Sequence, residues 1–232
     1  MTEKKNPTAS IRGRLKARAL RDGYNPARFL TAYYHEGLIA RIAKSAYREN
    51  FVLKGGLSLF GRYGFLARPT TDIDLGVRGI PNDLERVRAV FAEIVAVEFD
   101  DHLRFHAASI HARAILENAT YPGVRLEIPV HLGEARDLLQ LDLSFGNIVT
   151  PAPVVIDFPA VLEPRSDPIL GYRIETLLAE RFAAACELGI DNTRQKDFFD
   201  LYTITRSEAL EADSLLAAIR ATFEARHSSV TP

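Results

Sequence analysis

The chain has 232 residues, of which 47% are hydrophobic and 25% charged, and its net charge is −1. This composition excludes a disordered or fibrous chain and suits a globular protein long enough to bury its own core. The charged N-terminal segment lacks the apolar stretch of a signal peptide, and the single cysteine, Cys186, excludes an intrachain disulfide. No apolar run approaches the length of a membrane-spanning helix. We therefore expect a cytoplasmic protein without a membrane partner.

The small net charge hides an uneven distribution of charged residues. Residues 1–48 hold 11 Lys/Arg against 3 Asp/Glu, a net charge of +8, and the remainder of the chain carries −9. A basic segment of this kind can contact RNA or an acidic partner. A solvated helix face explains the same composition equally well, and the sequence leaves both interpretations open.

The first half of the chain alternates between helical and strand-like patterns. Helical periodicity covers 8–21 and 26–48, and Asn25-Pro26 supplies a cap and a first-turn proline for the second helix. The second helix has an apolar stripe made of Phe29, Tyr33, Ile39, Ile42 and Ala46. A buried strand at 51–53, a Gly-Gly turn with a short helix, a strand around 72–74 and a helix beginning at Pro81-Asn82-Asp83 follow in that order.

The second half begins with strands and ends with helices. Strand-like stretches occupy 103–106, 108–116, 124–132 and 138–145, and residues 123–128 alternate with period two like a half-exposed antiparallel strand. Residues 150–168 are rich in proline and predict a connector that crosses the surface. Three helices are predicted after it, over 172–188, about 196–206 and 208–226.

Residues 51–75 carry the strongest functional signal. Because strand side chains alternate between faces, Asp72 and Asp74 project to the same side, where two carboxylates repel unless a cation lies between them. Gly55 and Gly56 open a helix whose N-terminal N–H groups favour a phosphate, and they allow close approach. Each feature alone is usually only a turn or a solvated strand end. Together, in this order, they predict a site for a nucleoside triphosphate and Mg²⁺ or Mn²⁺.

Asp142 is the candidate for a third carboxylate. It lies in the middle of a predicted strand, among apolar neighbours in Leu-Gln-Leu-Asp-Leu-Ser-Phe. A buried carboxylate without a partner is costly, so we expect Asp142 to have one. If this strand pairs beside the strand of Asp72 and Asp74, then Asp142 joins the site. Otherwise it is a satisfied core aspartate or a strand-end cap.

Four motifs in sequence order carry a resemblance to a known family: Lys54-Gly55-Gly56, Arg68-Pro-Thr-Thr-Asp72-Ile-Asp74-Leu, Leu141-Asp142-Leu-Ser-Phe-Gly146 and Asn192-Thr-Arg194-Gln-Lys196-Asp197-Phe-Phe-Asp200-Leu201. With them the chain resembles the AbiEii-type nucleotidyltransferase toxins, within the polymerase-beta-like nucleotidyltransferase superfamily. The resemblance extends from about residue 25 to about residue 205 and implies an α+β fold, with a mixed or antiparallel sheet flanked by helices. The regions we expect are basic N-terminal helices packed on the core (1–48), a nucleotidyltransferase core (49–149), the connector (150–168) and a C-terminal helical domain (169–232).

The resemblance also implies roles for individual residues. It assigns the triphosphate to Gly55, Gly56 and Ser58, and the metal to Asp72, Asp74 and Asp142. Arg181 stands where the family usually has lysine; arginine keeps the charge and can fork onto phosphate oxygens, but it is a poorer proton donor or acceptor. Lys196 would join Arg181 in neutralising the leaving pyrophosphate. Asp197 and Asp200 belong to a motif that the family brings to the mouth of the active site, which makes them candidates for nucleotide binding.

The function that this resemblance implies is more specific than the residues alone support. It implies the toxin of a type IV toxin–antitoxin system, with a separately encoded antitoxin, that transfers a nucleotide to a target such as the acceptor end of tRNA. The residues alone indicate only metal-dependent chemistry on a nucleoside triphosphate. Two alternatives remain: the same chemistry on a small molecule or a protein hydroxyl, and a catalytically silent binding module. The three carboxylates argue against the second alternative, and the basic N-terminal segment slightly favours RNA.

Overall fold

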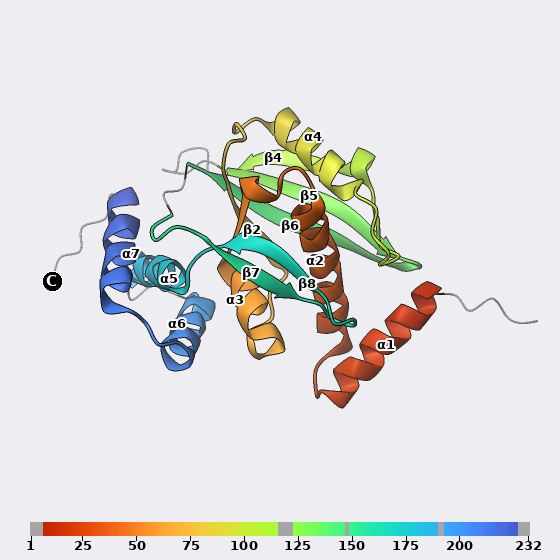
Figure 1. Ribbon diagram of the computed structural model, residues 1–232, viewed down its shortest axis with the longest axis horizontal. Helices are drawn as coiled ribbons and strands as arrows, with labels where there is room; N and C mark the ends of the chain where they lie inside the picture. Colours follow the sequence, from red (N-terminus) through yellow and green to blue (C-terminus); the bar gives the residue numbers. More distant parts are fainter. Residues whose placement is uncertain (1–6, 116–122, 147–148, 190–192, 227–232) are drawn as a thin grey trace, which may run out of the picture.

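The computed structural model describes residues 7–115, 123–146, 149–189 and 193–226, and at its centre lies one mixed eight-stranded sheet (Figure 1). The strands follow the order β3-β5-β6-β2-β1-β8-β7, and β4 also pairs with β5. Their bounds are β1 Phe51–Lys54, β2 Asp72–Val77, β3 Arg104–Phe105, β4 His111–Ile115, β5 Gly123–Leu132, β6 Ala135–Phe145, β7 Val154–Pro159 and β8 Ser166–Gly171. The pairs β2–β6 and β1–β8 are parallel and the others antiparallel, which confirms the predicted mixed sheet.

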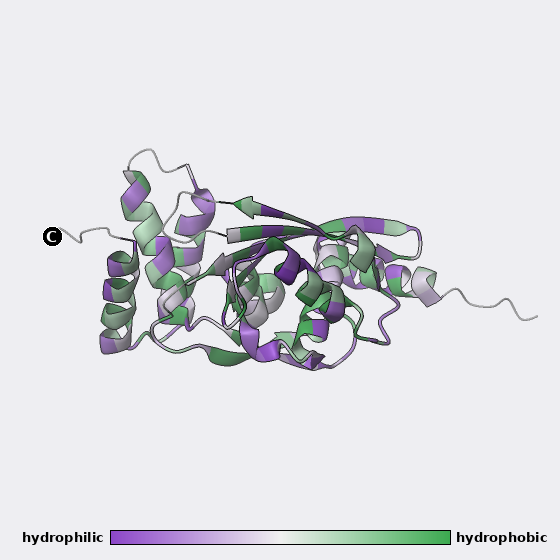
Figure 2. Cartoon of the chain, turned by 90° about the horizontal axis from the view of Figure 1, so that it is seen from above, coloured by the Kyte–Doolittle hydropathy of each residue, from purple (hydrophilic) through white to green (hydrophobic). Residues whose placement is uncertain are grey.

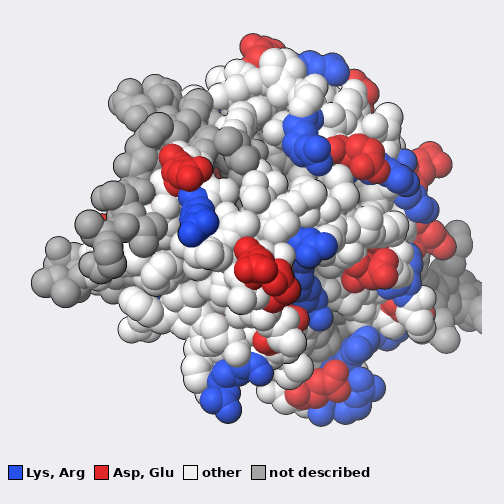
Figure 3. Space-filling view, turned by 60° about the vertical axis from the view of Figure 1, so that its left-hand side comes forward, with Lys and Arg blue, Asp and Glu red and all other residues white. Residues whose placement is uncertain are grey.

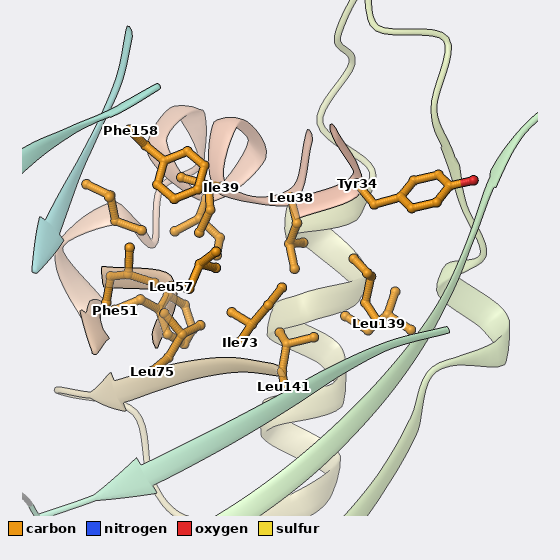
Figure 4. Packing of buried hydrophobic residues seen from close by; sticks show 14 of the residues in the cluster. Tyr34, Leu38, Ile39, Phe51, Leu57, Ile73, Leu75, Leu139, Leu141 and Phe158 are labelled. Atoms are coloured by element: carbon orange, nitrogen blue, oxygen red, sulfur yellow. The ribbon is translucent and has the colours of Figure 1, made fainter. Parts of the chain in front are cut away.

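Helix α2 (Pro26–Lys44) forms the centre of the hydrophobic core. The Asn25 side chain caps it by accepting a hydrogen bond from the backbone N–H of Ala27, as the sequence predicts. The helix is buried on nearly all sides rather than along one stripe, and Ala46 lies beyond its end and is exposed. Ile73 of β2 and Leu141 of β6 point toward this helix, and their alternate neighbours therefore point to the opposite face of the sheet (Figure 4).

The other helices flank the sheet. Their bounds are α1 Pro7–Arg21, α3 Gly55–Tyr63, α4 Leu84–Val95, α5 Ile174–Leu188, α6 Gln195–Ser207 and α7 Ala212–Ala225. Helices α5, α6 and α7 group at one end of the molecule, far from α1 (Figure 1). Alternate residues of β5 are fully buried and half-exposed, so one face of this strand is covered and the other is more open. In Figure 2 the long strands run along the top of the molecule, and no described helix lies above their length.

The segment 150–168 is not the irregular connector that its prolines predicted. It contains β7 and the first residues of β8, and these two strands pair with each other along their whole length. Pro159 ends the edge strand β7, where a missing N–H breaks no ladder. Pro168 is tolerated because β1 pairs only with Leu170 and Gly171 of β8, so Pro168 has β7 as its one neighbour.

Helix α5 also differs in detail from the predicted apolar face. Leu177 and Leu178 are buried as expected, whereas the side chain of Phe182 is 39% exposed. Within the described residues, no helix is both long and apolar enough to span a membrane. Asn192 of the fourth motif lies outside the described residues. The boundaries of the four expected regions and the cytoplasmic location stay predictions.

Candidate active site

Four charged side chains form a row across four neighbouring strands. Lys54 of β1 is paired with Asp74 of β2, Asp74 lies beside Asp142 of β6, and Asp142 is paired with Arg125 of β5. Residues that are directly paired across strands share a face of the sheet, so all four side chains lie on the face opposite α2. We call these four residues the charged row. Two carboxylates thus lie side by side between two cations.

Asp72 lies on the same face as the charged row, two residues before Asp74 on β2. Its Oδ1 atom is 3.4 Å from both Gln140 Nε2 and Thr71 Oγ1, and these contacts are long for hydrogen bonds. Neither Asp72 nor Asp74 forms an ion pair with another described residue. The strand therefore presents two carboxylates on one face without a direct counterion, as the sequence predicts.

The environment of Asp74 disfavours its ionised form. Burial is the main cause and raises the pKa of the Asp74 carboxyl, and the neighbouring carboxylates of Asp142 and Asp72 raise it further. The charges of Lys54 and Arg181 act in the opposite direction. A cation bound at this position would offset both the burial and the repulsion between carboxylates.

The start of helix α3 lies directly against Asp74. Gly55 has a φ of +62°, and a Cβ atom on it would lie 2.0 Å from Asp74 Oδ2, so only glycine fits this position. A Cβ on Gly56 would lie 3.0 Å from both Arg68 Nη2 and Thr70 Oγ1. No side chain caps this helix, and its first N–H groups are suited to a phosphate. The helix N-terminus predicted to bind phosphate and the carboxylates are therefore adjacent.

The structure buries Ser58, which the resemblance assigns to the triphosphate. Ser58 lies on α3 but is completely buried, and its hydroxyl accepts a hydrogen bond of 2.8 Å from Arg62 Nη1. Arg62 also donates to the backbone oxygen of Tyr172, just before α5. Ser58 thus helps to connect α3 to the C-terminal helices, and its role on the triphosphate stays a prediction.

Asp142 lies beside Asp74 on the same face, as predicted, but its carboxylate forms an ion pair with Arg125. Arg125 Nε and Nη2 each lie 2.6 Å from one oxygen of Asp142, a bidentate geometry that raises the pKa of Arg125. No group of three or more His, Cys, Asp or Glu side chains that could hold a metal occurs in the described part of the chain. The role of Asp142 as a third metal ligand therefore stays a prediction.

The residues present nevertheless fit Mg²⁺ at Asp72 and Asp74. Magnesium is usually bound by one or two protein carboxylates together with substrate phosphates and water, rather than by a complete cage of protein ligands. Asp72 and Asp74 supply such a pair without a direct counterion, beside a helix N-terminus suited to the phosphates. The site can thus hold a cation once the nucleotide supplies the remaining oxygens.

Helices α5 and α6 meet at a group of buried ion pairs. Arg181 contacts both Asp197 and Asp200, at 3.2 Å and 3.1 Å, and the two aspartate side chains are 0% and 1% exposed. Arg194 lies 3.0 Å from Asp197, and Arg68 lies 2.8 Å from Asp200. We call these five residues the ion cluster. Both aspartates are buried and paired with arginines of the chain, and the prediction that they bind the nucleotide stays a prediction.

Two arginines connect the ion cluster to the site. Arg181 lies near enough to Asp74 to lower the pKa of its carboxyl. Arg68 lies against Gly56 at the start of α3. Lys196 is exposed on α6 and forms no ion pair with a described residue, so its predicted role on the pyrophosphate remains untested.

The sequence reasoning missed the partners of the site rather than its carboxylates. Arg125 lies in the stretch whose alternation predicts a half-exposed strand, but nothing in the sequence pairs it with Asp142. Lys54 precedes the Gly-Gly turn, and the sequence does not place it opposite Asp74. Arg68 belongs to the second motif, but the motif does not pair it with Asp200. All three depend on strand pairing or helix docking, which a single sequence does not specify.

Comparison with known proteins identifies the family. The profile described as "Nucleotidyl transferase AbiEii toxin, Type IV TA system" matches residues 37–232. The chain belongs to this family. It is therefore a nucleotidyltransferase, which confirms both the resemblance and the predicted enzyme class. A search of curated proteins finds no match.

Two solved structures from Helicobacter pylori share the fold of this AbiEii-family chain. A putative nucleotidyltransferase matches with a TM-score of 0.55 and 14% identity, over 88% of this chain and 96% of its own. The protein JHP933 matches with a TM-score of 0.53 and 17% identity, over 79% of this chain and 68% of its own. At these identities the likeness shows the α+β fold and nothing finer.

Proposed function

We propose that this nucleotidyltransferase moves a nucleotide from a nucleoside triphosphate to a terminal hydroxyl of RNA, such as tRNA, with Mg²⁺ or Mn²⁺ held by Asp72 and Asp74. We further propose that it is the toxin of a type IV system with a separately encoded antitoxin, as its family implies. One observation carries the chemistry: the two carboxylates have no direct counterion and lie against the glycine-opened N-terminus of α3.

The chain's own residues account for the steps around the phosphates. The N–H groups of Gly55 and Gly56 would receive phosphate oxygens, and Arg68 and Arg181 would offset the negative charge of the departing pyrophosphate. The acceptor oxygen attacks the α-phosphorus, and the bond from that phosphorus to the bridging oxygen of the β-phosphate breaks. Asp142, oriented by Arg125, would take the proton of the acceptor hydroxyl. The bound cation supplies electrostatic stabilisation of the attacking and leaving oxygens.

The decisive experiment is nucleotide transfer with each labelled triphosphate, total cellular RNA and Mg²⁺ or Mn²⁺. We expect label in RNA with the wild-type protein. Replacing Asp72→Asn and Asp74→Asn together should lower the rate by about a thousandfold, because several kcal/mol of charge stabilisation are lost. A matched control, Asp213→Asn with Glu224→Gln, removes two exposed carboxylates on α7 and should leave the rate unchanged.

The same experiment separates the alternatives. Label that appears in protein or in a small molecule, and not in RNA, would reject RNA as the acceptor but keep the chemistry. A double variant that transfers nucleotides as fast as the wild type would reject the assignment of Asp72 and Asp74.

A further inference from the structure

The open face of the sheet continues from the charged row toward the β5–β6 hairpin, where it carries a second row of basic side chains. His131 of β5 is paired directly with Arg104 of β3 on one side and with Arg136 of β6 on the other. His106 Nε2 lies 3.2 Å from His131 Nδ1. We call Arg104, His131 and Arg136 the basic row. Within the described residues, none of the three forms an ion pair with a carboxylate.

The basic row places an arginine on either side of a histidine on adjacent strands. Burial together with His106 and Arg136 lowers the pKa of His131, so the positive charge of the row belongs mainly to Arg104 and Arg136. Near the charged row two arginines are opposed directly, because Arg113 of β4 is paired with Arg125. Arg125 is balanced by Asp142, whereas Arg113 is exposed and has no ion pair with a described residue. An anion lying over these positions would offset the repulsion.

The surface between the two rows suits unstacked bases. Arg136 and Asp142 lie on the same face of β6, six residues apart, which corresponds to about 20 Å along the strand. Between them, Leu138 is 52% exposed and is paired with Pro129 of β5, whereas the pair nearer the charged row, Glu127 with Gln140, is polar. Single-stranded RNA is held by base stacking and by phosphates on basic side chains, and the Leu138–Pro129 pair offers the bases an apolar surface beside the basic row.

A basic and aromatic groove extends this strip beyond the basic row. Arg104 and His106 also line an open groove of about 890 Å³, together with Lys44, Phe99 and Arg165. Lys44 Nζ lies 4.0 Å from the centre of the Phe99 ring, and Arg165 Cζ lies 4.4 Å from it. Glu98 and Asp100 line the same groove, and Arg165 is paired with Glu36 and Asp167. A nucleic acid strand that leaves the sheet face at β3 therefore meets Lys44 and the Phe99 ring.

Other charged regions of the molecule are less suited to a polyanion. In the basic N-terminal segment, Arg41 is buried against Asp101, and Arg14 pairs with Glu163. Arg28 donates to backbone oxygens of Phe65 and Ala67. On the side of the molecule where α5–α7 lie, acidic and basic side chains are interspersed (Figure 3).

We propose that the face between the charged row and the basic row binds a single-stranded RNA segment whose terminal hydroxyl reaches the carboxylates. Phosphates lie over Arg104, Arg136 and Arg113, and bases lie over Leu138 and Pro129. This inference rests on the proposed transfer to RNA and assigns its acceptor surface. The charge count of the sequence favours the N-terminal helices as the RNA-binding surface, whereas this inference places that surface on the sheet.

The test is fluorescence anisotropy with a labelled single-stranded RNA of about 12 nucleotides, a length that matches such surfaces. Arg104→Gln with Arg136→Gln should weaken binding by about tenfold. It should also reduce the slope of log affinity against log salt by about 1.4, since each phosphate contact to a single strand contributes about 0.7. The matched control, Arg12→Gln with Lys16→Gln, removes two exposed charges from α1 and should change neither quantity.

Each remaining outcome has a definite meaning. Equal affinity of the wild type and the Arg104/Arg136 variant overturns the proposal, as does an equal loss in the α1 control. Tighter binding of a duplex of the same length overturns the single-stranded path. The melting temperature of the Arg104/Arg136 variant should not fall appreciably, because both side chains are exposed and neither forms an ion pair with a described residue. Failure of the proposed function is visible separately, since the wild type would then label no RNA whatever its affinity for the probe.

Discussion

The charged row and the ion cluster are both groups of aspartates and arginines, but they balance their charges differently. In the ion cluster each buried aspartate contacts two arginines, and its side chain is at most 1% exposed. Asp74 of the charged row and the neighbouring Asp72 have no ion pair with any described residue. In the Asp142–Arg125 pair, each of the two side chains is 25% exposed. In the ion cluster the aspartate charges are paired within the chain. Asp72 and Asp74 have no such partner among the described residues.

This difference separates structural charges from catalytic ones better than residue type does. Asp197 and Asp200 belong to a family motif and lie near the site, yet their charge is already used in holding Arg68 and Arg181. Asp74 is also largely buried, and burial raises its pKa although the charges of Lys54 and Arg181 act in the opposite direction. A carboxylate without an ion pair, such as Asp72 or Asp74, is thus available to a ligand, whereas Asp197 and Asp200 are used in support.

Among the single substitutions that test this difference, the largest effect is expected from removing Arg181, which belongs to the ion cluster and lies near Asp74 of the charged row. Arg181→Ala leaves two buried carboxylates with one cation fewer each, which should lower the free energy of unfolding by about 3 kcal/mol. It should also slow nucleotide transfer by the folded fraction about a hundredfold, because a cation near the phosphates is lost. Urea unfolding and transfer assays on the same preparation measure the two effects.

Two further variants sharpen this prediction. Arg206→Ala removes an exposed arginine of α6 outside the ion cluster and should change neither stability nor rate appreciably. Arg181→Lys restores the residue usual in the family, but a lysine cannot contact Asp197 and Asp200 with two edges at once, so we expect an intermediate stability. Unchanged stability in Arg181→Ala would contradict the structural role, and unchanged turnover would contradict the role in the site.

A smaller effect, of opposite sign, is expected for stability at Asp74. Its folded pKa lies above the ordinary value of 3.8 through burial, so its contribution to stability is full below that value and is lost as the pH rises through the folded pKa. Without metal, Asp74→Asn should therefore raise the melting temperature at pH 7. The gain should shrink as the pH falls toward 4.

Thermal unfolding in EDTA between pH 4 and pH 8 measures this dependence, with Asp213→Asn on α7 as an exposed control. The groups that face Asp74 are Lys54, Arg181, Asp142 and Asp72, and all of them remain in the variant. A variant that melts below the wild type at every pH would show that the ionised carboxylate stabilises the free protein, contrary to this assignment.

Sequence patterns predicted the features that depend on neighbouring residues and missed those that depend on how strands pair. The alternation of β2 placed Asp72 and Asp74 on one face, and the Gly-Gly turn located the start of α3, because both follow from neighbouring residues. Asp142 required the parallel pairing of β2 with β6 and was predicted only conditionally. Arg125 depended on a further pairing and was missed.

The errors in the C-terminal half have the same origin. Residues 150–168 were interpreted from their prolines, which a strand tolerates where it lacks a second neighbour, and that depends on the sheet order. The burial of Asp197 and Asp200 likewise depends on the docking of α6 on α5, which their motif alone does not show. Local chemistry thus identified the site, and tertiary contacts decided which charges are available in it.

The smallest effect concerns Arg125, which balances one end of the charged row. An ion pair of this exposure contributes about 1 kcal/mol or less, so Arg125→Gln should lower the melting temperature by only about 2–4 °C. The same substitution frees the Asp142 carboxylate beside Asp74, and a third carboxylate should tighten Mn²⁺ binding about fivefold, the equivalent of about 1 kcal/mol. Calorimetric titration of Mn²⁺ in the presence of a non-hydrolysable triphosphate measures this directly.

Arg113→Gln is the matched control for Arg125, because it removes a neighbouring charge from the same face without breaking a pair to Asp142. If loss of positive charge alone governed Mn²⁺ affinity, the two variants would gain equally, and Asp142 would not be a metal ligand. A gain confined to Arg125→Gln means that Arg125 and the cation compete for one carboxylate. Asp142 would then exchange the guanidinium of Arg125 for the metal ion when the nucleotide binds. The aspartates of the ion cluster would keep their arginines.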